Sequence, residues 1–160
     1  MSSGAYSRRV PVIITLVIAL MLTVLPLPEW LEAWRPDWVA LTLVYWAMTA
    51  PRTWSVGSAW MVGLVLDVAQ GTLLGQHALA LCVVVFVTVR MHLLMRVFPG
   101  GQLTAAVFSL LALYQFILFW VNGVAGVPVD TIYYWAPVIS GAILWPAVNM
   151  LLTGVRMRVQ

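Results

Sequence analysis

The sequence predicts an all-α integral membrane protein, a six-transmembrane-helix bundle in which residues 1–160 form a single transmembrane domain. Hydrophobic residues make up 63% of the chain and charged residues only 8%, whereas a soluble domain carries about 25% charged residues. The mean hydropathy is +1.00. Six helices of about 20 residues each take up most of the chain and leave no room for a soluble domain. This composition excludes a soluble enzyme, a disordered tail and a protein that binds nucleic acid.

The first predicted span covers residues 10–27 and follows Arg8 and Arg9. Two arginines before an apolar run also occur in signal peptides, but no small-x-small cleavage site follows this run. We therefore expect an uncleaved first helix.

The second and third spans are predicted at residues 36–50 and 55–70. Pro36 suits the first turn of the second helix, because the N–H that proline lacks has no helical partner there. Only the short segment 51–53 separates the two runs. We therefore expect these two helices to pack as an antiparallel hairpin.

Three further spans are predicted at residues 74–97, 103–121 and 131–153. Pro137 and Pro146 lie within the last of these, and we expect both to kink it. The apolar runs do not alternate with polar residues, as the strands of a transmembrane β-barrel would.

All eight basic residues are arginines, and they divide unequally between the two sides of the predicted bundle. With the N-terminus in the cytoplasm, seven arginines fall in inner segments and one, Arg35, in an outer segment. The inner arginines are Arg8, Arg9, Arg52, Arg90, Arg96, Arg156 and Arg158. Because positive charge is retained on the cytoplasmic side, we expect both termini to be cytoplasmic.

Asp67 is the ionisable residue that most needs an explanation, because it lies toward the outer end of the third span. A carboxylate at membrane depth is costly and indicates a functional site by default. It is a structural residue, a contact to a ligand or partner, or a proton-coupling group. We expect its hydrogen-bond donors to be Trp or Tyr side chains or the N-terminus of another segment.

Small residues recur at every fourth position of the same span, at Ser55, Ala59 and Gly63, with Gly71 in the same phase. Asp67 lies on this face too. Small residues at this spacing let the backbone of another helix approach closely. The approaching helix belongs either to the same bundle or to a partner protein.

The chain shows no constellation of catalytic residues, and we expect that it is not an enzyme. His77 and His92 lie near opposite faces of the predicted bundle and cannot share a metal ion, and Cys82 has no second cysteine as a partner. We therefore expect no metal and no cofactor. An intramembrane hydrolase would need a nucleophile beside a base, and the sequence offers no such pair.

The segment from Arg35 to Leu79 carries a family resemblance. A proline opens its first helix, a Tyr–Trp pair lies near the end of that helix, and the next helix leads into Gly-Leu-x-x-Asp-x-x-x-Gly-x-x-x-Gly. The residues of this pattern are Pro36, Tyr45, Trp46, Gly63, Asp67, Gly71 and Gly75. The pattern resembles that of the rod shape-determining protein MreD family. The resemblance makes these residues the candidate interaction or cavity residues.

The resemblance implies a non-enzymatic component of the bacterial cell-elongation complex, located in the cytoplasmic (inner) membrane, that supports side-wall peptidoglycan synthesis and rod shape. The implied partners are MreC, MreB, RodZ, RodA, penicillin-binding protein 2 and membrane lipids. The family's bundle is also similar to the substrate-binding subunits of energy-coupling-factor vitamin transporters, which implies a cavity that opens outward. A small-molecule-binding subunit of such a transporter is therefore the alternative function.

Overall fold

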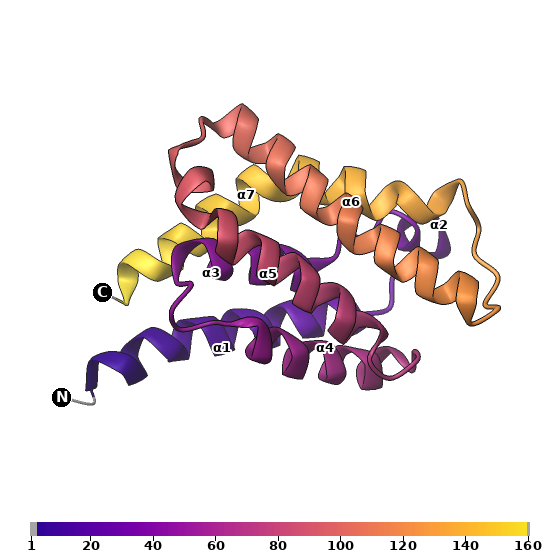
Figure 1. The fold of residues 1–160 in the computed structure, drawn as a ribbon, viewed down its shortest axis with the longest axis horizontal. Coiled ribbons are helices and arrows are strands. Elements are labelled where there is room, and N and C mark those ends of the chain that lie inside the picture. The colour runs from indigo at the N-terminus through magenta and orange to yellow at the C-terminus, as the bar shows by residue number, and fades with distance from the viewer. Residues whose placement is uncertain (1–2, 160) are drawn as a thin grey trace.

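The computed structural model describes residues 3–159, and the regular elements in this range are helical. Six main helices run back and forth along the long axis of the molecule (Figure 1). They are α1 (Ser3–Val24), α3 (Trp38–Thr49), α4 (Val56–Gln70), α5 (Gln76–Val97), α6 (Gly100–Val124) and α7 (Ala136–Arg158). Two short elements precede α3 and α7, namely α2 (Glu29–Glu32) and the 3₁₀ turn η1 (Tyr133–Trp135).

Helix α3 is the centre of the bundle. It has 12 residues, and those from Val39 to Met48 are all buried. It packs against α1, α5, α6 and α7. A helix that is apolar on every side is stable where other helices surround it, which explains why this short and strongly apolar segment lies inside.

Helix α4 packs mainly against α5 rather than against α3, so the predicted hairpin of the second and third spans is wrong. The reason is the small-residue face of α4, where Ala59 and Gly63 are buried. A Cβ atom added to Gly63 would lie only 2.2 Å from the Cα atom of Ala78 in α5. This close approach of two backbones directs α4 onto α5, and it assigns Ala59 and Gly63 of the small-residue stripe to a neighbour within the bundle.

Helices lie at each of the six predicted spans, with bounds that differ at several ends. Helix α1 ends at Val24, ahead of the prolines that follow it, and α6 is longer than predicted at both ends. Helix α7 begins only at Ala136, after the 3₁₀ turn, so Pro137 lies in its first turn. Proline is tolerated there, and only Pro146 lies in the interior of the helix, contrary to the expectation of two interior prolines.

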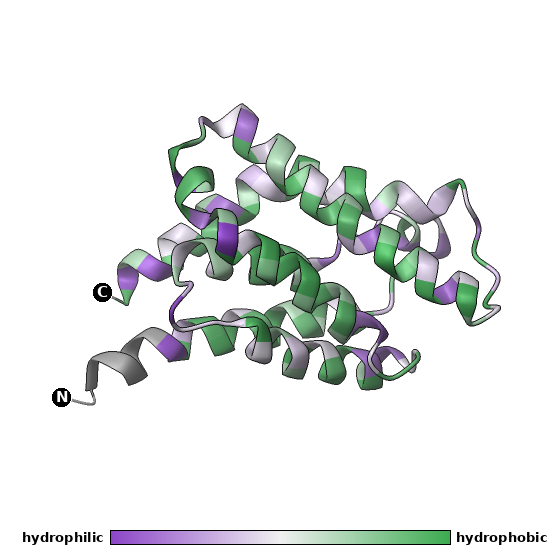
Figure 2. Cartoon of the chain, in the orientation of Figure 1, coloured by the Kyte–Doolittle hydropathy of each residue, from purple (hydrophilic) through white to green (hydrophobic). Residues whose placement is uncertain are grey.

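Three helical segments are long and apolar enough to cross a membrane, namely Gln76–Val97, Gly100–Val124 and Tyr133–Arg158. The remaining apolar segments are shorter: Arg9–Val24, Trp38–Thr49 and Val56–Gln70. Green apolar residues predominate along the long helices (Figure 2), and many large apolar side chains are exposed. Long apolar helices with an apolar exterior are typical of a membrane protein.

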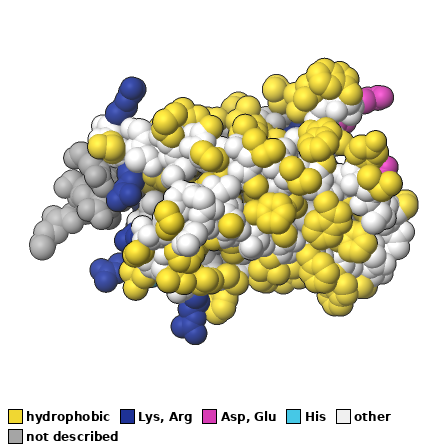
Figure 3. All heavy atoms as spheres, turned by 90° about the horizontal axis from the view of Figure 1, so that it is seen from above, with side chains coloured by type: hydrophobic (Ala, Val, Ile, Leu, Met, Phe, Trp, Pro, Cys, Tyr) yellow, Lys and Arg dark blue, Asp and Glu magenta, His cyan; other side chains and the backbone are white. Residues whose placement is uncertain are grey.

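Charged side chains gather at the two ends of the bundle (Figure 3). Arginines are found at the end where both termini lie, and carboxylates at the opposite end, where Arg35 also lies beside the end of α1. We call these the arginine end and the carboxylate end. The carboxylate end includes the connection from α1 to α3, the loop from α4 to α5, and the connection from α6 to α7.

Candidate functional site

The loop between α4 and α5 is shaped by two glycines. Gly71 ends α4 with a φ of 65°, and Gly75 precedes α5 with a φ of 96°. Both angles lie in the left-handed region, which glycine adopts without the steric cost of a side chain. The N–H of Thr72 donates to the carbonyl of Asp67 at 3.1 Å, as in the Schellman ending of a helix. The chain therefore reverses tightly and brings the start of α5 next to the end of α4.

The Asp67 carboxylate lies between the end of α4 and the start of α5, enclosed by the loop, and Asp67 is 0% exposed. Its Oδ1 atom accepts hydrogen bonds from the Thr72 hydroxyl at 3.0 Å, the His77 N–H at 2.9 Å and His77 Nδ1 at 2.7 Å. Its Oδ2 atom accepts one from the Gly75 N–H at 2.8 Å. The two backbone donors belong to the N-terminus of α5, the end of a helix that favours negative charge. Asp67 therefore caps α5 from the preceding helix.

His77 is the side chain that completes the cluster. Because an ionised carboxylate only accepts hydrogen bonds, His77 Nδ1 must carry the proton in its contact with Asp67. The imidazole is buried, and its ring centroid lies 6.3 Å from that of Tyr114 in α6. Sequence reasoning considered His77 only for a metal site shared with His92, which it excluded, and missed it as the partner of Asp67. Its place in the first turn of the helix after Gly75 is the signal that could have found it.

This cluster is arranged to hold the loop together. The hydroxyl of Thr72 donates to the carboxylate, and both carboxylate oxygens already accept hydrogen bonds from the chain itself. The expected donor from the N-terminus of another segment is present, whereas the side-chain donors are Thr72 and His77 rather than Trp or Tyr. Within residues 3–159, no group of three or more His, Cys, Asp or Glu side chains could hold a metal ion.

The other candidate residues lie in or beside α3. Pro36 is buried just before the helix begins. The Trp46 indole donates to the Thr15 hydroxyl of α1 at 3.0 Å, and the Tyr45 hydroxyl lies 3.0 Å from that of Thr153 in α7. Tyr45 and Trp46 thus tie the central helix to the first and last helices. The structure therefore brings Gly63, Asp67, Gly71 and Gly75 together along α4 and its loop. It places the other three motif residues separately, in α3 or just before it.

A pocket of about 380 Å³ lies at the arginine end, lined in part by Trp46. The resemblance implied a cavity that opens outward, which under the expected orientation means the carboxylate end. This pocket therefore lies at the opposite end from the one expected. Gly63, Asp67, Gly71 and Gly75 are not among its lining residues.

Comparison with known proteins adds to this geometry. The family model described as rod shape-determining protein MreD matches residues 6–155. The chain belongs to the MreD family. The rod shape-determining protein MreD of Haemophilus influenzae is 30% identical over 149 residues, which cover 90% of this chain and 89% of that protein. No solved structure matches the chain, so the likeness to transporter subunits stays a prediction.

The MreD match includes all seven candidate residues, since it runs from residue 6 to residue 155. MreD proteins are named for determining rod shape and are not a known enzyme family. This agrees with the cluster around Asp67, whose polar groups bind one another. The site is therefore a candidate structural element of a shape-determining membrane protein.

Proposed function

We propose that this protein is a non-enzymatic membrane component of the bacterial cell-elongation complex, where it supports MreC and side-wall peptidoglycan synthesis and so maintains rod shape. Membership of the MreD family over residues 6–155 is the observation that carries the proposal. The buried cluster supports it, because Asp67 is engaged in capping α5 and is not presented to a substrate. MreB, RodZ, RodA and penicillin-binding protein 2 are the further proposed partners.

The proposed topology is six crossings of the inner membrane with both termini in the cytoplasm. The separation of arginines and carboxylates between the two ends supports it (Figure 3). In a Cys82→Ser background, cysteines at Ser3 and Val159 should resist an impermeant thiol reagent in intact cells, while one at Ala33 should react. Labelling at Ser3 would contradict the proposed orientation and indicate the opposite one. Serine suits position 82 because the Cys82 thiol lies 3.4 Å from the Val56 carbonyl as a hydrogen-bond donor, which a hydroxyl can replace.

Depletion of the protein in a rod-shaped bacterium tests the proposed role. We expect cells to become round or swollen, because a scaffold for wall synthesis is lost. We expect solute uptake to be unchanged, because no transporter is lost. Re-expression of the wild-type chain is the control and should restore rods. Normal rods after complete depletion, over the full range of growth rates, would end the proposal.

Affinity purification in a mild detergent tests the proposed partners. We expect MreC to be recovered with the tagged protein, together with components of wall synthesis. Recovery of transporter ATPase subunits in place of MreC would favour the vitamin-carrier alternative. The partner must use a surface other than Ala59 and Gly63 of α4, because that face is buried within the chain.

A further inference from the structure

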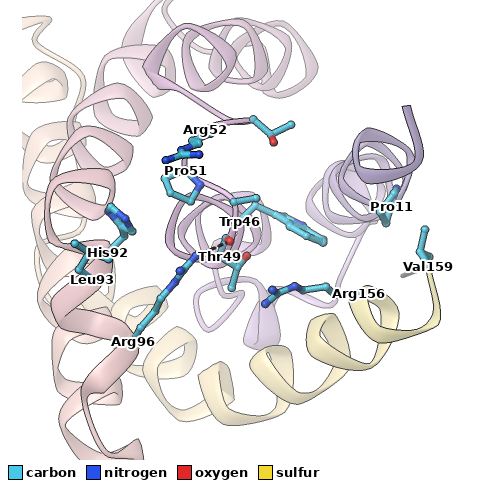
Figure 4. Close-up of a pocket in the computed structure, with 12 residues that line it drawn as sticks. Pro11, Trp46, Thr49, Pro51, Arg52, His92, Leu93, Arg96, Arg156 and Val159 are labelled. Atoms are coloured by element: carbon cyan, nitrogen blue, oxygen red, sulfur yellow. Dashed lines mark hydrogen bonds between the residues drawn. The ribbon is translucent and has the colours of Figure 1, made fainter. Parts of the chain in front are cut away.

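The pocket at the arginine end is built from four helices. Its walls come from the start of α1, the end of α3 with the turn that leads to α4, and the last turns of α5 and α7 (Figure 4). The cluster around Asp67 lies outside this pocket. The lining residues with the clearest chemistry are Pro11, Trp46, Leu93, Arg52, Arg96 and Arg156.

Arg96 is fixed in place by the end of α3. Its Nε donates to the Met48 carbonyl at 3.1 Å, and its Nη2 donates to the Thr49 carbonyl at 2.7 Å. A guanidinium has five N–H groups, so these bonds leave others for a further acceptor. Figure 4 shows Arg156 reaching from α7 into the same space beside Thr49, with Arg52 on the nearby turn.

The positive charge of this pocket is not balanced by carboxylates of the described chain. The ion pair found in residues 3–159 joins Asp67 and His77, far from the arginine end. Carboxylates are gathered at the other end of the bundle (Figure 3). Three guanidinium groups around one pocket repel one another, and an anion placed between them would relieve that repulsion. The pocket is therefore electrostatically suited to an anion.

We propose that this pocket binds the phosphate headgroup of an anionic phospholipid. Guanidinium groups bind phosphate oxygens in a bidentate manner that fixes both distance and orientation. The volume of about 380 Å³ lies in the range of about 300–1,000 Å³ that is typical of small-ligand sites. Basic pockets between transmembrane helices are known to bind anionic headgroups.

The apolar part of the lining favours a lipid over free phosphate. Leu93 is 67% exposed on the outer surface of α5 and also lines the pocket, whose lining further includes the buried rings of Pro11 and Trp46. A phospholipid brings acyl chains that can cover this surface, whereas inorganic phosphate gains nothing from it. Phospholipid phosphates line both surfaces of a bilayer, so this proposal does not depend on the orientation of the protein.

The test uses the full chain, purified in a neutral detergent. The protein is titrated with phosphatidylglycerol, with phosphatidylcholine of equal chain length, and with inorganic phosphate. Binding is followed by native mass spectrometry and by the melting temperature. We expect phosphatidylglycerol to be retained and to raise the melting temperature, and the other two probes to have little effect. Equal effects of phosphatidylglycerol and inorganic phosphate would overturn the assignment to a lipid.

Matched variants test whether phosphatidylglycerol binds in this pocket. The double variant Arg52→Gln/Arg156→Gln should weaken phosphatidylglycerol binding by about tenfold or more, because charge-assisted hydrogen bonds are lost. Arg158→Gln removes one charge of the same kind from an exposed position of α7 that does not line the pocket, and should bind as the wild type does. Equal weakening by Arg158→Gln would show general charge attraction and overturn the proposed pocket.

The single variant Arg52→Gln keeps the test decisive if the double variant does not fold. Arg52 is exposed on the turn between α3 and α4, so its replacement leaves the helix packing intact. We expect a smaller loss of phosphatidylglycerol binding than in the double variant, with an unchanged melting temperature in detergent without lipid. Wild-type binding by a folded Arg52→Gln variant would contradict the role of this arginine in the pocket.

Discussion

At the carboxylate end of the bundle, Asp67 is fully buried, and every donor around its carboxylate lies within 3.0 Å. At the arginine end, Arg52, Arg96 and Arg156 surround a pocket, and no carboxylate of residues 3–159 pairs with them. In the Asp67 cluster, the chain itself supplies all the hydrogen bonds of one buried charge. The arginines around the pocket at the other end have no carboxylate partner within residues 3–159.

The difference separates charge that stabilises the fold from charge that is available to a ligand. A buried charge is costly unless it is fully hydrogen-bonded, so removing it or its partners disturbs folding. A charge at the rim of an open pocket is hydrated when the pocket is empty, so the fold does not depend on it. Substitutions in the Asp67 cluster should therefore lower the stability of the fold. Substitutions of the pocket arginines should leave stability nearly unchanged and affect ligand binding.

The largest effect is expected from Asp67→Ala. The change removes the acceptor of four hydrogen bonds and leaves buried donors at the start of α5 without a partner. We expect a loss of about 3–5 kcal/mol in the free energy of unfolding, measured by denaturation of the purified protein. Asp130→Ala removes an exposed carboxylate from the same end and should change stability by less than about 0.5 kcal/mol. Equal stability of the two variants would remove the structural role of Asp67.

Gly63→Ala should have the next largest effect. The added methyl group would meet the backbone of Ala78, which can move only if α4 and α5 separate. We expect a loss of about 1–3 kcal/mol and a lower yield of folded protein in the membrane. Gly57→Ala is the matched control on the same helix, since its Cβ would meet only Ser55 Oγ, at 3.8 Å. A Gly63→Ala variant as stable as Gly57→Ala would show that this close contact does not hold the two helices.

Asp67→Asn should be milder than Asp67→Ala. The amide keeps the shape and one oxygen acceptor, but its NH₂ group would face either the Gly75 N–H or the donors that surround Oδ1. We expect a loss of about 1 kcal/mol, with membrane abundance close to wild type and rods retained. Round cells that contain folded Asp67→Asn protein at normal abundance would instead indicate that Asp67 contacts a partner.

The smallest effect on stability is expected at the arginine end. Arg52→Gln and Arg156→Gln, each made alone, should change the free energy of unfolding by less than about 0.5 kcal/mol in a neutral detergent without lipid. The measurement is the same denaturation experiment used for the Asp67 variants. A loss as large as that of Asp67→Asn would erase the difference between the two ends.

The sequence predicts the helices well, because apolar runs and prolines act locally. Gly71 and Gly75 mark the loop between α4 and α5, and both have the positive φ that glycine favours. Asp67 stands out because it is a carboxylate in an apolar helix. These features are visible without any knowledge of which helices touch.

Contacts between helices are what the sequence does not predict. The short segment after α3 suggests that α3 and α4 pair, yet the backbone contact of Gly63 with Ala78 places α4 on α5. His77 becomes the partner of Asp67 only because the loop turns back on itself. The pocket at the arginine end needs four helices to meet, so no single stretch of sequence contains its signal.

The length of α4 has a consequence for the surrounding bilayer. As a membrane crossing, its 15 residues span only about 22 Å at 1.5 Å per residue, against a hydrocarbon core of about 30 Å. The shorter α3 is enclosed by other helices and meets no lipid, but Met61 and Val68 of α4 are 69% and 72% exposed. Under the proposed topology, hydrophobic mismatch therefore acts beside α4, where the bilayer would have to become thinner. A neighbouring protein with an equally short crossing would relieve that deformation. The bilayer would therefore favour association of such a protein with the α4 side.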